Sequence, residues 1–290
     1  MKNNNGFRAH TGGHFFIALA LGLSASSAHA EWHPYFISEA FARSEPISVM
    51  DAVHGWEGDH KTGERQYIWS RLETGVKGEH WGMGVQFRKD YALSFSKDAS
   101  ELFGAIQNDE DLDAGRTYDV NLEANIIETT GLRFTWQDLM LPTLKTEFGL
   151  TLLKADYMID GSLNGTALAT GDKSYTYSAW ADYSYTEDVL FEREVDSVTG
   201  YGFALDAHVD WQFRPDWRLD LQAKDLPGWV WWKDLPYTRA TAESAREHTE
   251  DDGFRSWDPM VSGIESNHSR YKQTLPFKGT GDIYYSGWDM

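Results

Sequence analysis

The sequence predicts an all-β fold, namely an antiparallel up-and-down transmembrane β-barrel of about 10–12 strands with long loops. Three observations predict this fold. Long segments alternate apolar and polar residues, as a strand with one apolar face and one wet face does. Aromatic residues gather at the ends of these segments, as they do in the girdles of membrane barrels. Tight turns separate most of the segments, so residues 31–290 are expected to form a single β-barrel domain.

Residues 1–30 have the features of a cleaved secretory signal peptide. Lys2 and Arg8 supply positive charge, and the short apolar core F-F-I-A-L-A-L-G-L covers residues 15–23. Residues 28–30 read Ala-His-Ala, a small-x-small cleavage site. The nine residues of the apolar core are too few to cross a bilayer as a helix. The sequence therefore predicts export and removal of this segment.

Composition limits the classes of partner. The chain holds 45 Asp and Glu against 26 Lys and Arg, a formal net charge of −19. Such acidity argues against nucleic-acid binding, which needs a basic surface. The chain has no cysteine, so packing, strand pairing or membrane burial must stabilise it instead of disulfides. The mature sequence has no apolar run long enough for a transmembrane helix.

The first part of the chain predicts three strands and two loops. Residues 44–65 contain prolines and glycines and are expected to form a loop. Residues 96–115 are polar and acidic, which predicts a second long loop with a short helix near Ala99–Ile106. The expected strands are Tyr35–Ala42, Gln66–Val76 and an alternating segment from Trp81 to Arg88.

The middle of the chain predicts short strands joined by tight turns. Thr130-Gly131 is expected to turn the chain, and Asp160-Gly161 and Gly171-Asp172 are expected to do the same. The expected strands around these turns are Tyr118–Ile126, Leu132–Trp136, Lys145–Ala155, a weak strand ending near Ala169, and Tyr175–Tyr185.

The clearest pattern is a hairpin of Tyr201–Phe213 with Trp217–Lys224. The odd-numbered residues from 201 to 213 are all apolar or small, and this stretch would extend about 43 Å at roughly 3.3 Å per residue. A tilted strand needs only about 9–11 residues to cross a bilayer. Residues 214–216, Arg-Pro-Asp, supply the turn.

The alternation also predicts the register of this hairpin. If Phe213 opposes Trp217, both faces of the pair are consistent in polarity. Asp210 then faces Asp220, a repulsive pair unless Arg218 reaches across diagonally. The same register predicts the pairs Trp211–Leu219, Val209–Leu221, Gln212–Arg218 and Asp206–Lys224.

The C-terminal part is less regular. Residues 234–263 lack the period of a strand, so Thr241–His248 is expected to form a short helix and residues 250–253 a loop. Further strands are expected over Trp229–Trp232, at about 269–277 and at about 282–288.

Together these features resemble the outer-membrane β-barrel proteins of Gram-negative bacteria over most of residues 31–290. The segment G-Y-G-F-A-L-D-A-H-V-D-W…W-R-L-D-L-Q-A-K-D-L-P-G-W-V-W-W is similar in style to hairpins of FadL-like barrels. The resemblance implies an outer-membrane location, contact with outer-membrane lipid and other envelope proteins, and assembly by the barrel-assembly machinery. Many such barrels end in Phe or Trp, whereas this chain ends at Met290, which predicts either a degenerate assembly signal or a non-standard closure.

The residues expected to carry function lie on the wet face and at the strand ends. Rings of carboxylates in a lumen favour cations, but side chains often fill a narrow barrel, so a pore and a salt-bridged core both fit the pattern. The expected lumen-facing polar row is Asp119, Glu123, Asp182, Asp206, His208, Asp210, Arg218, Asp220 and Lys224. The expected membrane-interface aromatics are Trp81, Tyr91, Trp211, Trp217, Trp229 and Trp231.

Motifs for catalysis and metal binding are weak. Ser266-Asn267-His268-Ser269 has the residue types of a serine hydrolase, but neighbours in a strand point to opposite faces, and a polar loop explains the stretch better. The acidic and histidine cluster Asp51, His54, Asp59 and His60 has no diagnostic metal-ligand spacing. The sequence therefore predicts no catalytic residue, no metal and no cofactor.

The leading hypothesis is an outer-membrane barrel that acts as a channel or as the barrel component of an envelope export or assembly system. It is not expected to be an enzyme, although a lipid-modifying outer-membrane hydrolase is one alternative. A structural or adhesive surface protein with binding loops is a second. A soluble secreted β protein that binds carbohydrate through exposed tryptophans is a third.

Overall fold

The computed structural model describes residues 32–53, 56, 58–191, 193–249 and 255–287. This part of the chain forms thirteen strands in one antiparallel sheet, together with two short helices. The helices are α1 (Val49–Val53) and α2 (Lys97–Gln107). The strands are β1 (His33–Ser44), β2 (Arg65–Lys77), β3 (Trp81–Phe95), β4 (Thr117–Leu141), β5 (Leu144–Gly171), β6 (Ser174–Tyr185), β7 (Gly200–Arg214), β8 (Trp217–Lys224), β9 (Gly228–Trp232), β10 (Leu235–Thr249), β11 (Arg255–His268), β12 (Tyr271–Thr274) and β13 (Lys278–Tyr285).

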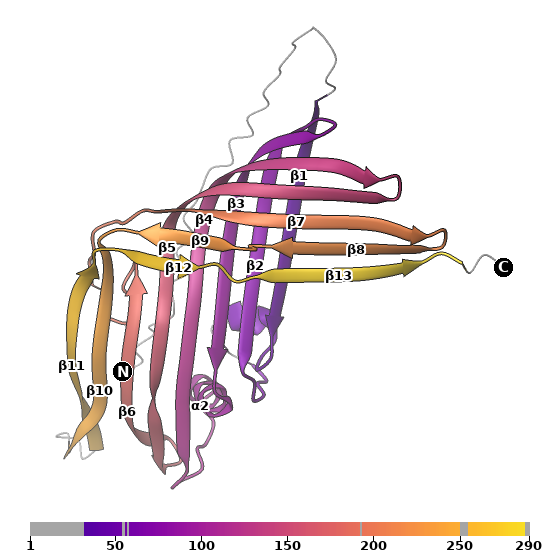
Figure 1. Ribbon diagram of the computed structural model, residues 1–290. Helices are drawn as coiled ribbons and strands as arrows, with labels where there is room; N and C mark the ends of the chain where they lie inside the picture. The colour runs from indigo at the N-terminus through magenta and orange to yellow at the C-terminus, as the bar shows by residue number, and fades with distance from the viewer. Residues whose placement is uncertain (1–31, 54–55, 57, 192, 250–254, 288–290) are drawn as a thin grey trace.

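The predicted all-β, antiparallel class is confirmed, and β4 and β5 form the spine of the sheet (Figure 1). They pair with each other along almost their whole length, and β1, β2 and β3 extend the sheet beyond β4. On its other edge β5 has two different neighbours. Residues 144–155 pair with β7, whereas residues 159–171 pair with β6. The sheet therefore branches at the middle of β5.

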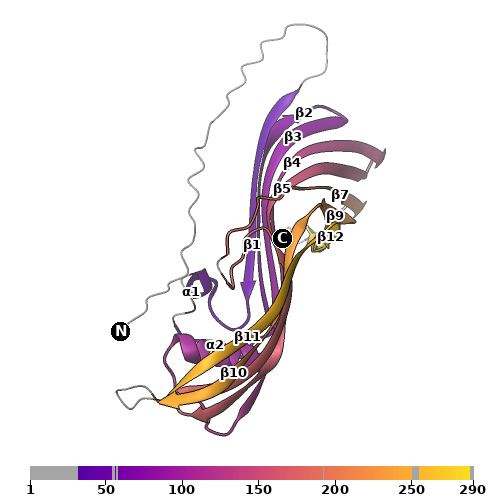
Figure 2. The same cartoon turned by 90° about the vertical axis from the view of Figure 1, so that its left-hand side faces the viewer.

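The two branches separate in space. The first runs through β7 to β8 and β13, with β9 and β12 beside it, and crosses the upper part of the molecule (Figure 1). The second runs from β6 through β10 to β11 and descends at the lower left. Seen from the side, the sheet is strongly curled, and α1 and α2 lie against one side of its lower part (Figure 2).

A β-bulge marks the branch point. Thr129 pairs with Ala155 and Glu128 pairs with Tyr157, so Asp156 is an extra residue on β5. A bulge bends and twists the strand that carries it. The part of the sheet between this bulge and the β4–β5 turn is called the upper half. It consists of residues 129–155 of β4 and β5, with the strands beside them. The lower half consists of residues 117–128 of β4 and 157–171 of β5, with β6, β10, β11, α2 and the described residues between β6 and β7.

Two of the predicted turns are wrong, because Thr130-Gly131 lies inside β4 and Asp160-Gly161 lies inside β5. Their glycines serve close strand packing instead. A Cβ atom at Gly161 would come within 2.3 Å of the Asp182 carbonyl oxygen. The predicted turn at Gly171-Asp172 is confirmed by the pairing of Gly171 with Ser174.

The predicted helix at Thr241–His248 is also wrong. These residues belong to β10, which is held between β6 and β11 by long runs of pairing. Pairing on both edges overrides the weak local pattern of this segment. The expected loop at 250–253 lies outside the described residues. By contrast, the short helix expected near Ala99–Ile106 is confirmed by α2.

The hairpin of β7 and β8 tests the predicted register directly. Trp211 opposes Leu219 and Val209 opposes Leu221, as predicted. Phe213 does not oppose Trp217, because an irregularity near the turn places Arg214 there instead.

The described sheet is an open half-barrel rather than a closed barrel of about 10–12 strands. Within the described residues, β1 pairs only with β2 and β11 pairs only with β10. The C-terminal strands β12 and β13 pair with β9 and β8. No helix in the described part of the chain has the length and apolar character needed to cross a membrane.

Candidate functional site

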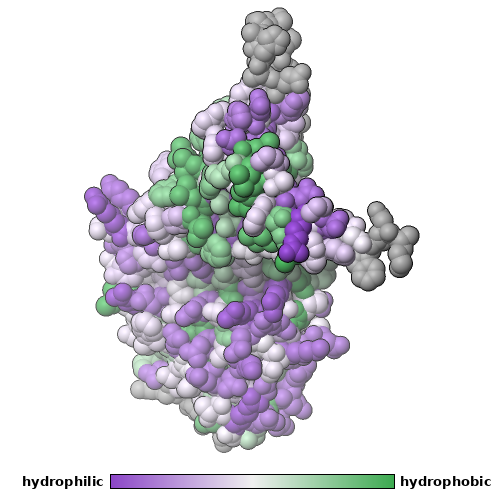
Figure 3. Space-filling view, turned by 45° about the vertical axis from the view of Figure 1, so that its right-hand side comes forward, coloured by the Kyte–Doolittle hydropathy of each residue, from purple (hydrophilic) through white to green (hydrophobic). Residues whose placement is uncertain are grey.

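The outer face of the upper half is apolar and exposed. Across β3, β4, β5 and β7, consecutive partners on this face include Val85, Leu132, Leu152 and Phe203. Figure 3 shows hydrophobic residues gathered on the upper part of the molecule and hydrophilic residues below. Residues on this face with exposed fractions between 37 and 70% are Phe36, Trp81, Met83, Val85, Phe87, Leu132, Phe134, Phe148, Leu150, Leu152, Tyr201, Leu205, Trp211, Phe213, Trp217, Leu221, Trp231 and Ile283. Soluble monomers rarely expose so continuous an apolar face.

The aromatics predicted for the membrane interface lie on this face or at its boundary. Trp81, Trp211, Trp217 and Trp231 are exposed. Trp229 and Tyr91 are half-buried, and the Tyr91 hydroxyl donates to Glu128 at 2.6 Å. Trp211, Phe213 and Trp217 form a run of ring contacts at the tip of the β7–β8 hairpin.

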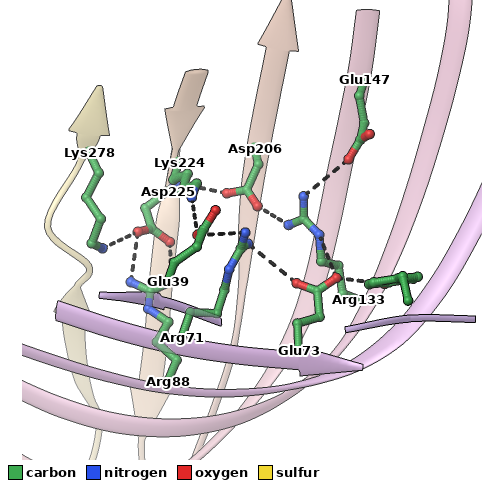
Figure 4. Close-up of polar contacts among 11 residues, drawn as sticks. Glu39, Arg71, Glu73, Arg88, Arg133, Glu147, Asp206, Lys224, Asp225 and Lys278 are labelled. Carbon is green, nitrogen blue, oxygen red and sulfur yellow. Dashed lines mark hydrogen bonds and ion pairs between the residues drawn. The ribbon is translucent and has the colours of Figure 1, made fainter. Parts of the chain in front are cut away.

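The inner face of the same strands carries a dense network of charges, which we call the ion network (Figure 4). Its members come from eight strands and from the residue that follows β8. The acids and cations are equal in number, so the network is neutral overall. The acids are Glu39, Glu73, Asp90, Glu147, Asp206 and Asp225, and the cations are Arg71, Lys77, Arg88, Arg133, Lys224 and Lys278.

Arg133 is the centre of one part of the ion network (Figure 4). It contacts Asp206, lies 3.6 Å from Glu73 and lies 3.8 Å from Glu147. Glu73 also accepts a 2.7 Å hydrogen bond from the Tyr35 hydroxyl. Because Arg133 and Glu73 are buried, each charge depends on its partners rather than on water.

Arg88 is the centre of the other part. Its two terminal nitrogens donate to the Asp225 carboxylate at 2.6 and 2.8 Å, a bidentate pair, and its Nε contacts Asp90. Lys278 bridges the same two acids, at 2.8 Å from Asp90 and 2.6 Å from Asp225. Both carboxylates are fully buried.

The ion network also ties distant strands together across the inside of the curl. Lys224 on β8 lies 2.5 Å from Glu39 on β1, and Lys278 on β13 reaches Asp90 on β3. These contacts join the end of the first branch to the start of the sheet. The curl is therefore held by side-chain ion pairs, without backbone pairing between β1 and β13 in the described chain.

Little free space remains inside the upper half. The cavity among the ion-network residues measures ≈ 10 Å³, which is about the smallest volume that holds a water. Next to it lies a buried apolar cluster that includes Ile127, Met158, Val230 and Trp232. Ile127 is the register partner of Asp90, so the cluster continues directly from the network. Ions and apolar side chains together occupy the inner side of the upper half and of its junction with the lower half.

The structure does not bring the predicted polar row together. Asp206 and Lys224 belong to the ion network. Asp119, Glu123 and Asp182 lie on the lower half.

The remaining four members of the row form pairs within the β7–β8 hairpin. Arg218 makes a bidentate contact with Asp210, both bonds at 2.7 Å, and so relieves the repulsion between Asp210 and Asp220. His208 lies 3.1 Å from Asp220.

Most of the ion network was missed from the sequence. Two strands carried a local signal. In each, a basic and an acidic residue lie two positions apart, on the polar face of an alternating segment. These are Arg71 with Glu73 on β2 and Arg88 with Asp90 on β3. Asp225 carried no such signal, because it lies in a loop and has a positive φ of 62°.

In the lower half the outer face of the sheet is covered by other parts of the chain, whereas in the upper half the same face is exposed. Leu102 and Ala105 of α2 pack on Tyr118 and Ala167. Beyond α2, the described residues that follow β6 also cover this face: Asp188 bonds to Tyr183, and Val195 packs against the cluster that contains Tyr183 and Tyr185.

Asp188 holds the loop after β6 against the outer face of β6. It is buried and accepts hydrogen bonds from the Tyr183 hydroxyl at 2.7 Å and from the Phe191 N–H at 3.1 Å. Burial alone would raise the pKa of Asp188, but these bonds and the Arg193 guanidinium hold it below its usual range.

The residues of the weak catalytic and metal motifs are scattered. His268 contacts Ser184 rather than Ser266 or Ser269, at 3.1 Å between Nε2 and Oγ. Asp51 accepts a hydrogen bond from Ser48, and His54 lies outside the described residues. Within the described part of the chain, no group of three potential metal ligands comes together.

No family model matches the chain, and neither a curated protein nor a solved structure is significantly similar to it.

Proposed function

We propose that this chain is a membrane-inserted β-sheet protein of the Gram-negative outer membrane, exported through a cleaved signal peptide. Its upper half lies in lipid, and its lower half extends into water. Its role is that of the barrel component of an envelope export or assembly system rather than of a free-standing open channel.

One observation carries the proposal: the same strands expose apolar residues on one face and bury a neutral ion network on the other. This is the reverse of a soluble protein, where apolar side chains gather inside. Leu132 and its neighbour Arg133 illustrate the contrast, since they are 52 and 7% exposed. Alternation of this kind is what a membrane barrel requires, with lipid outside and polar groups inside.

The dimensions of the apolar face also fit a bilayer. From Trp81 to Phe87 the face extends about 23 Å along β3, and from Tyr201 to Phe213 about 43 Å along β7, at roughly 3.3 Å per residue. These two lengths bracket the apolar band of about 25 Å on outer-membrane barrels. A strand as long as β7 fits such a band when it is tilted.

Two features favour an assembly component over an open channel. The ion network and the apolar cluster occupy the inner side of the upper half, and the cavity among the network residues measures only ≈ 10 Å³, which argues against a wide water path there. The edges of β1 and β13 are unpaired in the described residues. Since lipid cannot satisfy bare backbone groups, a neighbouring strand from another envelope protein must cover these edges in the membrane.

Fractionation and conductance test the proposal. We expect the mature protein to stay in the membrane after salt and alkaline washes and to leave only with detergent. Release by salt alone would contradict membrane insertion. In planar bilayers the purified chain should give no current above background, and a steady conductance would favour the channel alternative instead.

A further inference from the structure

The inner face of the lower half forms an open basin of ≈ 1020 Å³, which the proposed membrane role does not use. Strands β4, β5, β6 and β10 provide its floor, and the lower ends of β1 and β2 provide one wall. Residues 274–277 border it on another side. The cover made by α2 and by Asp188 and Val195 lies on the opposite face of the sheet, so it leaves the basin open.

The floor is a grid of hydrogen-bonding side chains. Two adjacent inward rungs of the sheet run across β4, β5, β6 and β10, and cross-strand neighbours on one face lie about 4.5–5.5 Å apart. The first rung consists of Glu123, Ser162, Asp182 and Arg239, and the second of Asn125, Asp160, Ser184 and Tyr237.

Part of this hydrogen-bonding capacity is free for a ligand. Asp182 accepts from Arg239 Nε at 2.9 Å through one carboxylate oxygen. Glu123 accepts a long bond of 3.4 Å from the Ser94 hydroxyl. A carboxylate can accept about four hydrogen bonds, so both acids keep acceptor positions that face the basin.

Aromatic rings stand around this polar floor. Trp180 is 42% exposed. Phe41 and Phe277 are exposed at the rim. The His268 ring lies against Tyr237 in a tilted contact, with 4.3 Å between ring centroids.

The basin has no net charge. Its three carboxyl groups are Glu123, Asp160 and Asp182, and its three guanidinium groups are Arg43, Arg65 and Arg239. Burial raises the pKa of Asp160, although a hydrogen bond from Tyr271 opposes the shift. Burial and the Arg239 charge lower the pKa of His268.

We infer that this basin binds a neutral oligosaccharide. A sugar ring has an apolar face of C–H groups, which stacks on an indole or phenyl ring, and hydroxyls that both donate and accept. Trp180 supplies the stacking surface, and Glu123 and Asp182 supply acceptors for the hydroxyls. The basin volume of ≈ 1020 Å³ lies just above the range for ligand sites, about 300–1,000 Å³, so it suits several linked sugar rings.

Other ligand classes fit less well. An acyl chain would displace water from the basin floor but could not hydrogen-bond to the carboxyl and amide side chains there. Each side-chain group left unsatisfied would cost about 1–3 kcal/mol. A polyanion or a polycation would find charges of both signs in equal number. A neutral polyhydroxylated ligand meets neither penalty.

Titration calorimetry on the full mature chain in detergent tests the inference. The probes are cellohexaose, maltohexaose and chitohexaose, with inorganic phosphate and spermine as charged controls. We expect at least one of the three sugars to bind, and phosphate and spermine not to bind at the same concentrations. Trp180→Ala should weaken that binding by about tenfold or more, and Asp182→Asn should weaken it as well.

Trp32→Ala is the matched control, because Trp32 is 49% exposed and lies outside the basin. It should leave sugar binding unchanged. The inference is wrong if none of the sugars binds up to about 10 mM, if Trp180→Ala binds as the parent does, or if only a charged probe binds. These readouts are independent of membrane insertion, so failure here leaves the proposed membrane role intact.

Discussion

The upper and lower halves of this molecule are built from the same two strands, β4 and β5, yet they place their apolar side chains in opposite surroundings. Below the Asp156 bulge, Tyr118 and Ala167 on the outer face are buried under α2. Above the bulge, Leu132 and Leu152 on that face are exposed. The inner faces differ in the reverse sense, because the ion network is buried above and the basin is open below.

This difference is what the proposed membrane role expects, in which each half faces a different solvent. In the lower half, α2 and the loop after β6 cover the apolar outer face and shield it from water, as in a soluble protein. The upper half has no such cover in the described chain, and its charges are balanced internally. A bilayer around the upper half and water around the lower half would satisfy both.

The largest expected effect comes from breaking the ion network. Arg133→Leu leaves Glu73, Glu147 and Asp206 without their shared cation, and breaking a buried ion pair costs about 3–5 kcal/mol. We expect the free energy of unfolding in detergent, measured by denaturant titration, to fall by that amount.

Arg239→Leu on the lower half is the control for this change. Arg239 pairs with Asp182 but is 54% exposed in its side chain, and exposed pairs contribute about 0–1 kcal/mol. Equal losses from the two arginine variants would mean that the upper network is no more buried than the lower pair.

The next effect tests the exposed apolar face. Leu132→Arg should cost about 2–4 kcal/mol in a lipid bilayer, because Leu132 would face the hydrocarbon near the middle of the apolar band. Leu190→Arg is the matched control, since Leu190 is 53% exposed on the lower half and should change stability by about 0.5 kcal/mol or less. Refolding into vesicles at a series of urea concentrations measures both, and a neutral result for Leu132→Arg would count against lipid contact.

A smaller effect tests the cover of the lower half. Asp188→Asn removes the charge that Tyr183 and Arg193 contact, and hydrogen bonds to a charged group contribute about 1.5–3 kcal/mol. Because the folded pKa of Asp188 lies below its usual value of 3.8, this stability is present above pH 3.8 and is lost as the pH falls through the folded pKa. The variant and the parent should therefore differ at pH 7 and converge in acid, whereas a gap that is independent of pH would show that the charge is not responsible.

The sequence predicted the local features of the fold better than the distant ones. The register of Val209 with Leu221 follows from alternation across one short turn, so it was readable. Thr130-Gly131 and Asp160-Gly161 have turn composition, yet pairing on both sides keeps them inside long strands. β10 and β11 were missed because their pairing, and not their own pattern, makes them strands.

The candidate site was only partly readable for the same reason. Alternation indicated which face is wet, and it identified Asp206 and Lys224 as members of that face. Their partners Arg133 and Glu39 lie 73 and 185 residues away along the chain. Nothing in the local pattern predicts such contacts, because they depend on how the whole sheet curls.

The most direct test of the central claim is the depth of Leu132 in a membrane. The chain has no cysteine, so Leu132→Cys and Leu190→Cys can each carry a single bimane label without further changes. In vesicles that contain lipids brominated on the acyl chains, we predict strong quenching of the label at position 132 and none at position 190. Equal quenching at both positions, or none at position 132, would contradict the claim that the upper half lies in lipid.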